Sequence, residues 1–170
     1  MDTKGIRFGQ NGELIIDRIF EASRELVFRA WTDPELFMRW WGPKDFTSPF
    51  CKMDFRVGGR YHFSLRSPDG KDYWSTGEYR EIVPPSRLVF TDSFADDKGN
   101  AVPASYYGME VDWPEELVVT LIFEEVDSRR TRMILTHTGM PPGEVVEMTG
   151  ASWNESFDKL QKLLNEYQNA

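Results

Sequence analysis

The chain has 170 residues, a length typical of one domain, and 14% of them are aromatic. Six Trp and twelve Phe are many for this length, so we expect them in the core or around a pocket. The formal net charge of −8 argues against general nucleic-acid binding and against electrostatic docking to a membrane, because an acidic surface repels phosphates. We therefore expect a single domain over residues 1–170 that binds no nucleic acid.

Cysteine usage and hydropathy indicate the cellular compartment. Cys51 is the only cysteine, so an internal disulfide is excluded, which fits a reducing compartment. The first ten residues have no apolar core of a secretory signal, and no stretch approaches the roughly 20 apolar residues that span a bilayer. We expect a cytoplasmic protein without a membrane span.

Along the N-terminal part of the chain, the spacing of the apolar residues changes from that of a strand to that of a helix. Glu13–Phe20 has β-branched residues in partial alternation and predicts a strand. Ser23 is a suitable N-cap for a short helix that ends near Trp31. Asp33-Pro34 places a cap and a first-turn proline at the start of a second short helix, which Gly42-Pro43 ends.

The middle of the chain, to about Gly139, has the pattern of strands separated by turns. Ala95–Pro114 is rich in Asp, Gly, Asn and Pro and predicts a long loop. Within it, Tyr106–Met109 is interpreted as a lid, a contact patch or an extra edge strand. The predicted strands are Thr47–Phe55, Tyr61–Arg66, Tyr73–Val83, Arg87–Phe94, Leu117–Phe123 and Thr131–Thr138.

The C-terminal segment, from Gly143 to about Tyr167, predicts one long helix with a single apolar face. Such a face must be buried, and the inner face of the sheet is the only partner large enough. An antiparallel sheet of six to seven strands twists and curls, so it can wrap around the helix. The predicted fold class is α+β: a curved antiparallel sheet of six to seven strands around a long C-terminal helix, with two short helices after the first strand. Space left between helix and sheet would form a cavity.

Alternation along the strands and spacing along the helices predict the side chains that line this cavity. Trp40 and its neighbour Trp41 point about 100° apart on a helix, so we expect one to anchor the helix and the other to border the cavity. The alternative is that both pack in the core. The predicted apolar lining residues are Trp40, Phe63, Leu65, Leu121, Met133, Leu135, Trp153 and Phe157, and the polar residues that would orient a ligand are Ser75, Tyr79 and His137.

Residues for metal or nucleophilic chemistry are few. His62 and His137 are the only histidines, so with one cysteine neither a Cys/His zinc set nor a three-His site can form. No Gly-x-Ser-x-Gly elbow is present, and Gly58-Gly59 precedes no helix that would bind phosphate. We expect no metal, no cofactor and no catalytic residue. His137 is predicted to be a hydrogen-bonded core or rim residue in preference to a general base.

Motifs along nearly the whole chain resemble one family. They are Ala30–Glu35 (AWTDPE), Trp40–Pro43 (WWGP), Arg56–Arg60 (RVGGR), Glu78–Pro85 (EYREIVPP), Arg87–Thr91 (RLVFT), Thr131–Gly139 (TRMILTHTG) and a final helix with Gly150, Trp153 and Phe157. Together they resemble the homologues of the activator of heat-shock protein 90 ATPase, specifically its C-terminal domain. The resemblance implies the helix-grip fold of the START-like (SRPBCC) superfamily, whose members bind lipids, hormones or other apolar molecules, and some of which use the cavity as an active site.

Three functions follow from these observations. The leading hypothesis is a binding protein for a small apolar or lipid-like ligand in the cavity. The family resemblance suggests an alternative, a module that contacts a chaperone. A further alternative is an enzyme that uses the cavity for acid–base chemistry, which requires a titratable group such as His137 or Glu78 to point into it. We favour binding over catalysis.

Overall fold

The computed structural model describes residues 5–109, 114, 116–140 and 144–168. In this part of the chain the helices are α1 (Arg24–Thr32), α2 (Pro34–Trp40), the short 3-10 helix η1 (Ala104–Tyr107) and α3 (Glu144–Gln168). The strands are β1 (Ile6–Phe8), β2 (Leu14–Phe20), β3 (Thr47–Met53), β4 (Arg60–Arg66), β5 (Asp72–Val83), β6 (Arg87–Ala95), β7 (Leu117–Asp127) and β8 (Arg130–Thr138).

The strands form one antiparallel sheet in the order β1-β2-β8-β7-β6-β5-β4-β3. The predicted α+β architecture is confirmed, with eight strands instead of six to seven. The additional strand is β1, which pairs with β2 through Ile6 and Ile16. Its polar, glycine-containing surroundings show no alternation, so the strand depends on pairing with β2 and not on its own sequence.

The two short helices begin where the sequence predicts. The Ser23 hydroxyl accepts a hydrogen bond from the Leu26 amide at 3.3 Å, and the Asp33 carboxylate accepts one from the Glu35 amide at 3.0 Å. These caps satisfy amides that the first turn of a helix leaves without partners. Both helices therefore follow from local chemistry.

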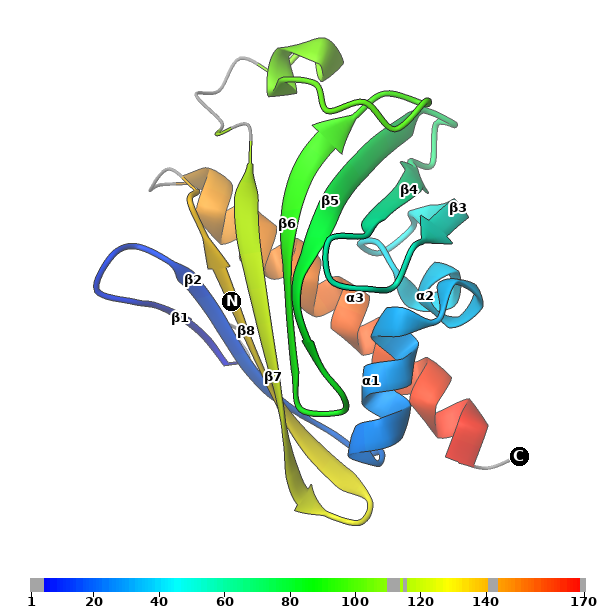
Figure 1. Ribbon diagram of the computed structural model, residues 1–170, viewed down its shortest axis with the longest axis vertical. Coiled ribbons are helices and arrows are strands. Elements are labelled where there is room, and N and C mark those ends of the chain that lie inside the picture. The colour runs from blue at the N-terminus through cyan, green and yellow to red at the C-terminus, as the bar shows by residue number, and fades with distance from the viewer. Residues whose placement is uncertain (1–4, 110–113, 115, 141–143, 169–170) are drawn as a thin grey trace.

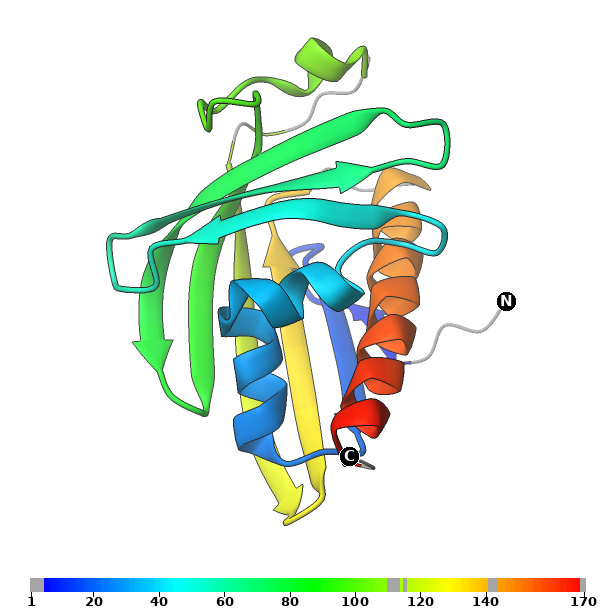
Figure 2. The same cartoon turned by 90° about the vertical axis from the view of Figure 1, so that its right-hand side faces the viewer.

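The sheet curls strongly at its β3–β6 end. The pairing of β5 with β6 is irregular between Tyr79 and Glu81, and such a bulge bends a strand and increases its twist. Figure 2 shows β3, β4 and β5 arching over α1 and α2. The sheet thus forms a concave face that the helices cover.

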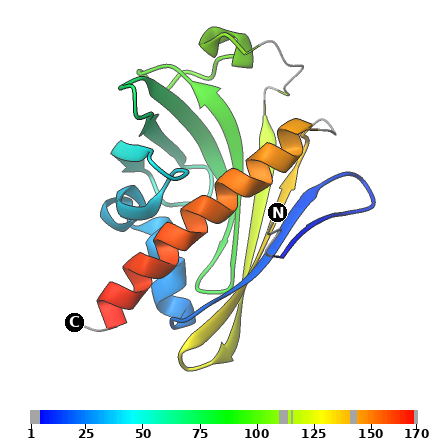
Figure 3. The same cartoon turned by 180° about the vertical axis from the view of Figure 1, so that it is seen from behind.

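Helix α3 crosses this concave face diagonally, from the ends of β7 and β8 towards α1 (Figures 1 and 3). Phe157 of α3 lies edge-on to Phe20 of β2, with ring centroids 5.9 Å apart, and is fully buried. Among the described residues, no helix is long and apolar enough to cross a membrane.

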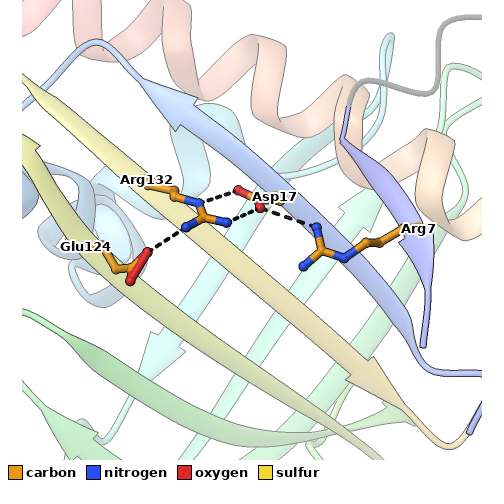
Figure 4. Close-up of polar contacts among 4 residues, drawn as sticks. All are labelled: Arg7, Asp17, Glu124 and Arg132. Carbon is orange, nitrogen blue, oxygen red and sulfur yellow. Dashed lines mark hydrogen bonds and ion pairs between the residues drawn. The ribbon is translucent and has the colours of Figure 1, made fainter. Parts of the chain in front are cut away.

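Charged residues join four neighbouring strands on the sheet face away from α3 (Figure 4). Asp17 of β2 accepts hydrogen bonds from Arg132 of β8 at 2.5 and 2.9 Å and from Arg7 of β1 at 3.3 Å. Arg132 also contacts Glu124 of β7 at 3.2 Å. The hydrogen bond from Arg132 lowers the pKa of Asp17, which keeps the carboxylate ionised in this network.

The predicted long loop after β6 contains the helical turn η1. The Tyr107 hydroxyl donates to the Ala95 carbonyl at 2.5 Å and accepts from the Trp74 amide at 2.9 Å. These bonds hold η1 against the ends of β5 and β6. Of the interpretations of Tyr106–Met109, an extra edge strand is therefore wrong. Residues 110–113 of the predicted loop lie outside the described residues.

Candidate functional site

A cavity of about 590 Å³ lies between the N-terminal half of α3, the inner face of β4–β6 and the segment that follows α2. This volume falls within the range of about 300–1,000 Å³ typical of small-molecule sites. Aromatic and other apolar side chains form most of its wall. The lining residues are Trp41, Gly42, Pro43, Phe63, Leu65, Ser75, Asp92, Phe94, Met109, His137, Met148, Thr149, Ser152, Trp153 and Ser156.

A second, much smaller space adjoins this cavity. Its volume is about 30 Å³, which is room for about one water molecule. Trp41, Phe63, Asp92 and Trp153 line both spaces. The larger cavity is therefore the one with room for a ligand.

Six of the eleven residues predicted from the sequence border these spaces. Phe63, Leu65, Ser75, His137 and Trp153 line the larger cavity. Tyr79 lines only the smaller one and is 3% exposed. The predicted polar residues thus lie at different depths, with Ser75 and His137 in reach of the larger space.

The other five predicted residues are buried core residues and border neither of these two spaces. They are Trp40, Leu121, Met133, Leu135 and Phe157, each 0% exposed. The reason is the diagonal path of α3. Helix α1 contacts β7 and β8, and α3 contacts β2, so Leu121, Met133 and Leu135 pack in the core.

Of the adjacent residues Trp40 and Trp41, one anchors the helix and the other borders the cavity, as predicted. The Trp40 indole is buried and donates to the Ala30 carbonyl at 3.0 Å, which anchors α2 to α1. Trp41 borders both spaces, stacks on Phe37 at a centroid distance of 4.9 Å and meets the edge of Trp153 at 4.9 Å. The cavity residue of the pair is Trp41.

The segment after α2 is held in the cavity wall by Lys159 of α3. Its ammonium donates to the carbonyls of Gly42 and Phe46, each at 3.0 Å, and lies within 3.5 Å of those of Trp41 and Pro43. Gly42 has φ of +108°, a conformation that favours glycine, and a Cβ there would lie 2.7 Å from Leu65. Burial lowers the pKa of Lys159.

Asp92, one of the two ionisable residues of the wall, was missed by the sequence interpretation, whereas His137 was predicted. Asp92 of β6 lies 3.9 Å from His137 of β8, measured from Oδ2 to Nε2. The signal was present, because residues two apart in a strand lie on the same face and Asp92 falls in the series of Leu88, Phe90 and Phe94. The further lining residues that were not predicted are Gly42, Pro43, Phe94, Met148, Thr149, Ser152 and Ser156, while Met109 belongs to the segment interpreted as a lid.

Neighbouring side chains fix how Asp92 and His137 are oriented. The Trp153 indole donates to Nδ1 of His137 at 3.3 Å, so the neutral imidazole carries its proton on Nε2, the atom nearest Asp92. On the other side of Asp92, the Tyr61 hydroxyl lies 3.4 Å from Oδ1 and donates mainly to the Thr91 carbonyl at 2.6 Å. The carboxylate therefore has little hydrogen bonding from the protein.

Burial shifts the pKa values of His137 and Asp92 in opposite directions. The pKa of His137 falls to about 4, and the side chain is 3% exposed. The pKa of Asp92 rises to about 6 by desolvation, although 29% of its side chain is exposed. At pH 7 and above the cavity thus presents an ionised carboxylate beside a neutral imidazole.

Other reactive groups lie away from this constellation. Burial raises the pKa of the Cys51 thiol to about 12, so it stays protonated at neutral pH. Glu78 pairs with Arg80 at 2.7 Å and lines neither cavity. In the part of the chain that the structure describes, no group of three or more His, Cys, Asp or Glu residues is placed to hold a metal ion.

A curved antiparallel sheet that encloses a long C-terminal helix and a cavity defines a helix-grip domain. The model of the family described as Activator of Hsp90 ATPase homolog 1-like protein matches residues 21–165, so the chain belongs to this family. The resemblance indicated by the motifs is confirmed. A search among curated proteins gives no match.

Solved structures of bacterial proteins share the fold over most of their length. A protein from Arthrobacter aurescens is 26% identical, with a TM-score of 0.79 over 97% of this chain and 93% of its own. A Staphylococcus epidermidis protein is 28% identical, with a TM-score of 0.72, covering 95% and 94%. The AHSA1 protein of Silicibacter pomeroyi is 24% identical, with a TM-score of 0.74, covering 91% and 99%.

Proposed function

We propose that this protein binds a small apolar or lipid-like molecule in the 590 Å³ cavity, acting as a cytoplasmic binding protein. The observation that carries the proposal is the composition of the cavity wall. Trp41, Phe63 and Trp153 give a large aromatic surface, while Asp92 and His137 supply one polar position. Apolar walls with few convergent polar groups are typical of small-molecule sites.

The experiment is a thermal-shift and native mass-spectrometry panel of fatty acids, sterols and aromatic metabolites. A ligand that binds only the folded state stabilises it by about 2.7 kcal/mol at one hundred times its Kd, which raises the Tm by several degrees. Members of the panel that bind should therefore raise the Tm and give a mass adduct of one molecule per chain.

A pair of matched variants separates binding in the cavity from binding elsewhere. Ser75 lies in β5 between Phe63 of β4 and Phe94 of β6, so Ser75→Trp fills the space. Ser128→Trp adds the same bulk in the exposed turn between β7 and β8, away from the cavity. Binding should be lost in Ser75→Trp and kept in Ser128→Trp. Equal binding by both variants, or no ligand for the unaltered protein, would refute the proposal.

A second candidate function is contact with a chaperone ATPase, which the description of the matched family favours. Its test is the ATPase rate of an Hsp90-type chaperone with excess protein. Stimulation that is equal for wild type and Ser75→Trp would support a surface contact independent of the cavity. An unchanged ATPase rate at saturating protein would count against it.

A third candidate is acid–base catalysis in the cavity, favoured by the position of Asp92. A carboxylate with a pKa of about 6 suits a general base near neutral pH, whereas His137, with a pKa of about 4, is a weak base. Any ligand found in the panel is incubated with the protein and examined for a change in mass or isomeric form. Turnover that disappears in Asp92→Asn would support catalysis, and unchanged recovery of the ligand would count against it.

A further inference from the structure

At the polar end of the cavity, a hydrogen-bond donor of His137 that has no partner among the described residues lies beside a hydrogen-bond acceptor of Asp92. Within the residues that the structure describes, Nε2 of His137 has no hydrogen-bond partner. Oδ2 of Asp92 is 3.9 Å away, too far for a direct hydrogen bond. A buried N–H without a partner is energetically unfavourable, because it has lost its hydrogen bonds to water. The site therefore favours an occupant that places a polar atom between these two groups.

The protonation states determine what that atom must do. Because Trp153 donates to Nδ1 of His137, Nε2 carries a hydrogen and needs an acceptor. Asp92 is ionised at pH 7 and above and needs a donor. An oxygen about 2.8 Å from both atoms fits across the 3.9 Å gap. A hydroxyl group meets both needs with one atom.

Other ligand groups satisfy only one side of this pair. An ammonium donates to Asp92 but offers no acceptor to the imidazole N–H. An ether or ketone accepts from His137 but offers no donor to the carboxylate. A carboxylate ligand would meet the negative charge of Asp92 in a largely apolar wall, which disfavours it.

The surrounding wall fits a flat apolar body attached to this hydroxyl. Trp153 stacks on Phe157 with centroids 5.6 Å apart and meets Trp41 edge-on, so its position is fixed on several sides. Phe63, which meets the edge of Trp41 at a centroid distance of 5.3 Å, and Phe94 also line the cavity. Rigid aromatic surfaces of this kind pack well against planar ligands.

We infer that the cavity selects apolar molecules that carry a hydroxyl group, which donates to Asp92 while its oxygen accepts from the imidazole N–H of His137. The inference rests on the proposed binding function and specifies the chemical class of its ligand. Asp92 and His137 are then the residues that determine specificity, and the aromatic wall supplies the bulk of the affinity.

The test compares four biphenyls of nearly equal shape with the intact protein at pH 7.5. They are 4-phenylphenol, 4-methylbiphenyl, 4-phenylbenzylamine, whose amine is an ammonium at this pH, and biphenyl-4-carboxylate. One charge-assisted hydrogen bond corresponds to roughly tenfold or more in affinity, so 4-phenylphenol should bind at least about tenfold more tightly than 4-methylbiphenyl. The amine and the carboxylate should both bind more weakly than the phenol.

Two variants and one spectroscopic signal test whether the preference for a hydroxyl group arises at Asp92 and His137. In Asp92→Leu and His137→Phe, the ratio between phenol and methyl compound should fall towards one. In the unaltered protein, phenol binding should shift the Nε2 resonance of His137 in proton–nitrogen spectra, with His62 as the internal reference. This second measurement does not depend on whether a variant folds.

The outcomes separate the two proposals. Equal binding of 4-phenylphenol and 4-methylbiphenyl in the cavity would overturn the hydroxyl preference and leave the binding function intact. A phenol preference that persists in both variants, or an unmoved Nε2 resonance, would also overturn it. If none of the four compounds binds and the wider panel is negative as well, the binding function itself fails.

Discussion

The Trp153 indole donates a hydrogen bond to Nδ1 of His137 at 3.3 Å, which links α3 to β8 at the polar end of the cavity. The bond fixes one of the two neutral forms of the imidazole and turns its remaining N–H towards Asp92. A residue of the aromatic wall thus controls the chemistry of the polar position. Helix α3 supplies both the wall and the orientation of the histidine.

Trp153→Phe tests this control, because it keeps an aromatic ring and removes the donor. We expect a loss of about 1–3 kcal/mol in the free energy of unfolding, from the lost hydrogen bond and reduced packing. His137 should also populate the form protonated on Nδ1, which nitrogen chemical shifts report. Trp40→Phe is the matched control, since its indole donates to Ala30 instead. It should lower stability and leave the His137 spectrum unchanged.

Variants of His137 and Asp92 should show opposite dependence of folding stability on pH. Below pH 6.5 the unfolded chain protonates His137, whereas the folded chain does so only near its pKa of about 4, so His137 lowers stability as the pH falls through this range. Asp92 acts in the other direction. Its folded pKa of about 6 exceeds the ordinary 3.8, so the folded chain binds the extra proton and stability rises as the pH falls.

The two contributions largely cancel in the unaltered protein between pH 4 and 6. Relative to wild type, Asp92→Asn should lose stability from pH 6.5 to 4, and His137→Gln should gain it, each by about 1–3 kcal/mol. Urea unfolding at half-unit pH steps measures both differences. Slopes of the same sign in the two variants would contradict the opposed titrations.

Much of the fold could be predicted because its signals are local. Ser23 and Asp33 cap helices within three residues, and the alternation in β7 and β8 marks strands without reference to the rest of the chain. Strand β1 has no such signal and forms only by pairing with β2. The order of the elements also follows from these local patterns, and the family motifs occur in the same order along the chain.

The cavity wall was harder to predict, because it depends on where α3 crosses the sheet. Leu135 and Phe63 both face the concave side, yet Leu135 packs in the core while Phe63 borders the cavity. Trp41 shows a second difficulty. It follows the end of α2 and has an extended backbone, with φ of −65° and ψ of 137°, so helical spacing does not give its direction.

The contacts of Lys159 predict its role in holding the segment after α2. Hydrogen bonds from a charged donor are worth about 1.5–3 kcal/mol, and Lys159 reaches several carbonyls that no other side chain is shown to bind within the described residues. Lys159→Met should therefore cost about 1–3 kcal/mol and speed amide hydrogen exchange over residues 41–46. Lys162→Met, at an exposed position of the same helix, is the control and should change neither. Unaltered exchange in Lys159→Met would contradict the anchoring role.

The distinction between core and cavity wall predicts that two truncations act on different properties. Leu135 is 0% exposed, so Leu135→Ala should leave a void and cost about 2–5 kcal/mol in unfolding free energy. Met148 lines the cavity and is 62% exposed, so Met148→Ala should change stability by less than about 0.5 kcal/mol.

The two truncations should affect ligand affinity in the opposite order from stability. Met148→Ala removes a side chain from the rim and should weaken binding of 4-phenylphenol several-fold, while Leu135→Ala should leave its Kd nearly unchanged under conditions where the variant is folded. Urea unfolding and isothermal titration of the same protein samples measure both quantities. If Leu135→Ala weakened binding more than Met148→Ala, then Leu135 would belong to the ligand site together with His137 of the same strand, and the cavity would extend further than its lining residues indicate.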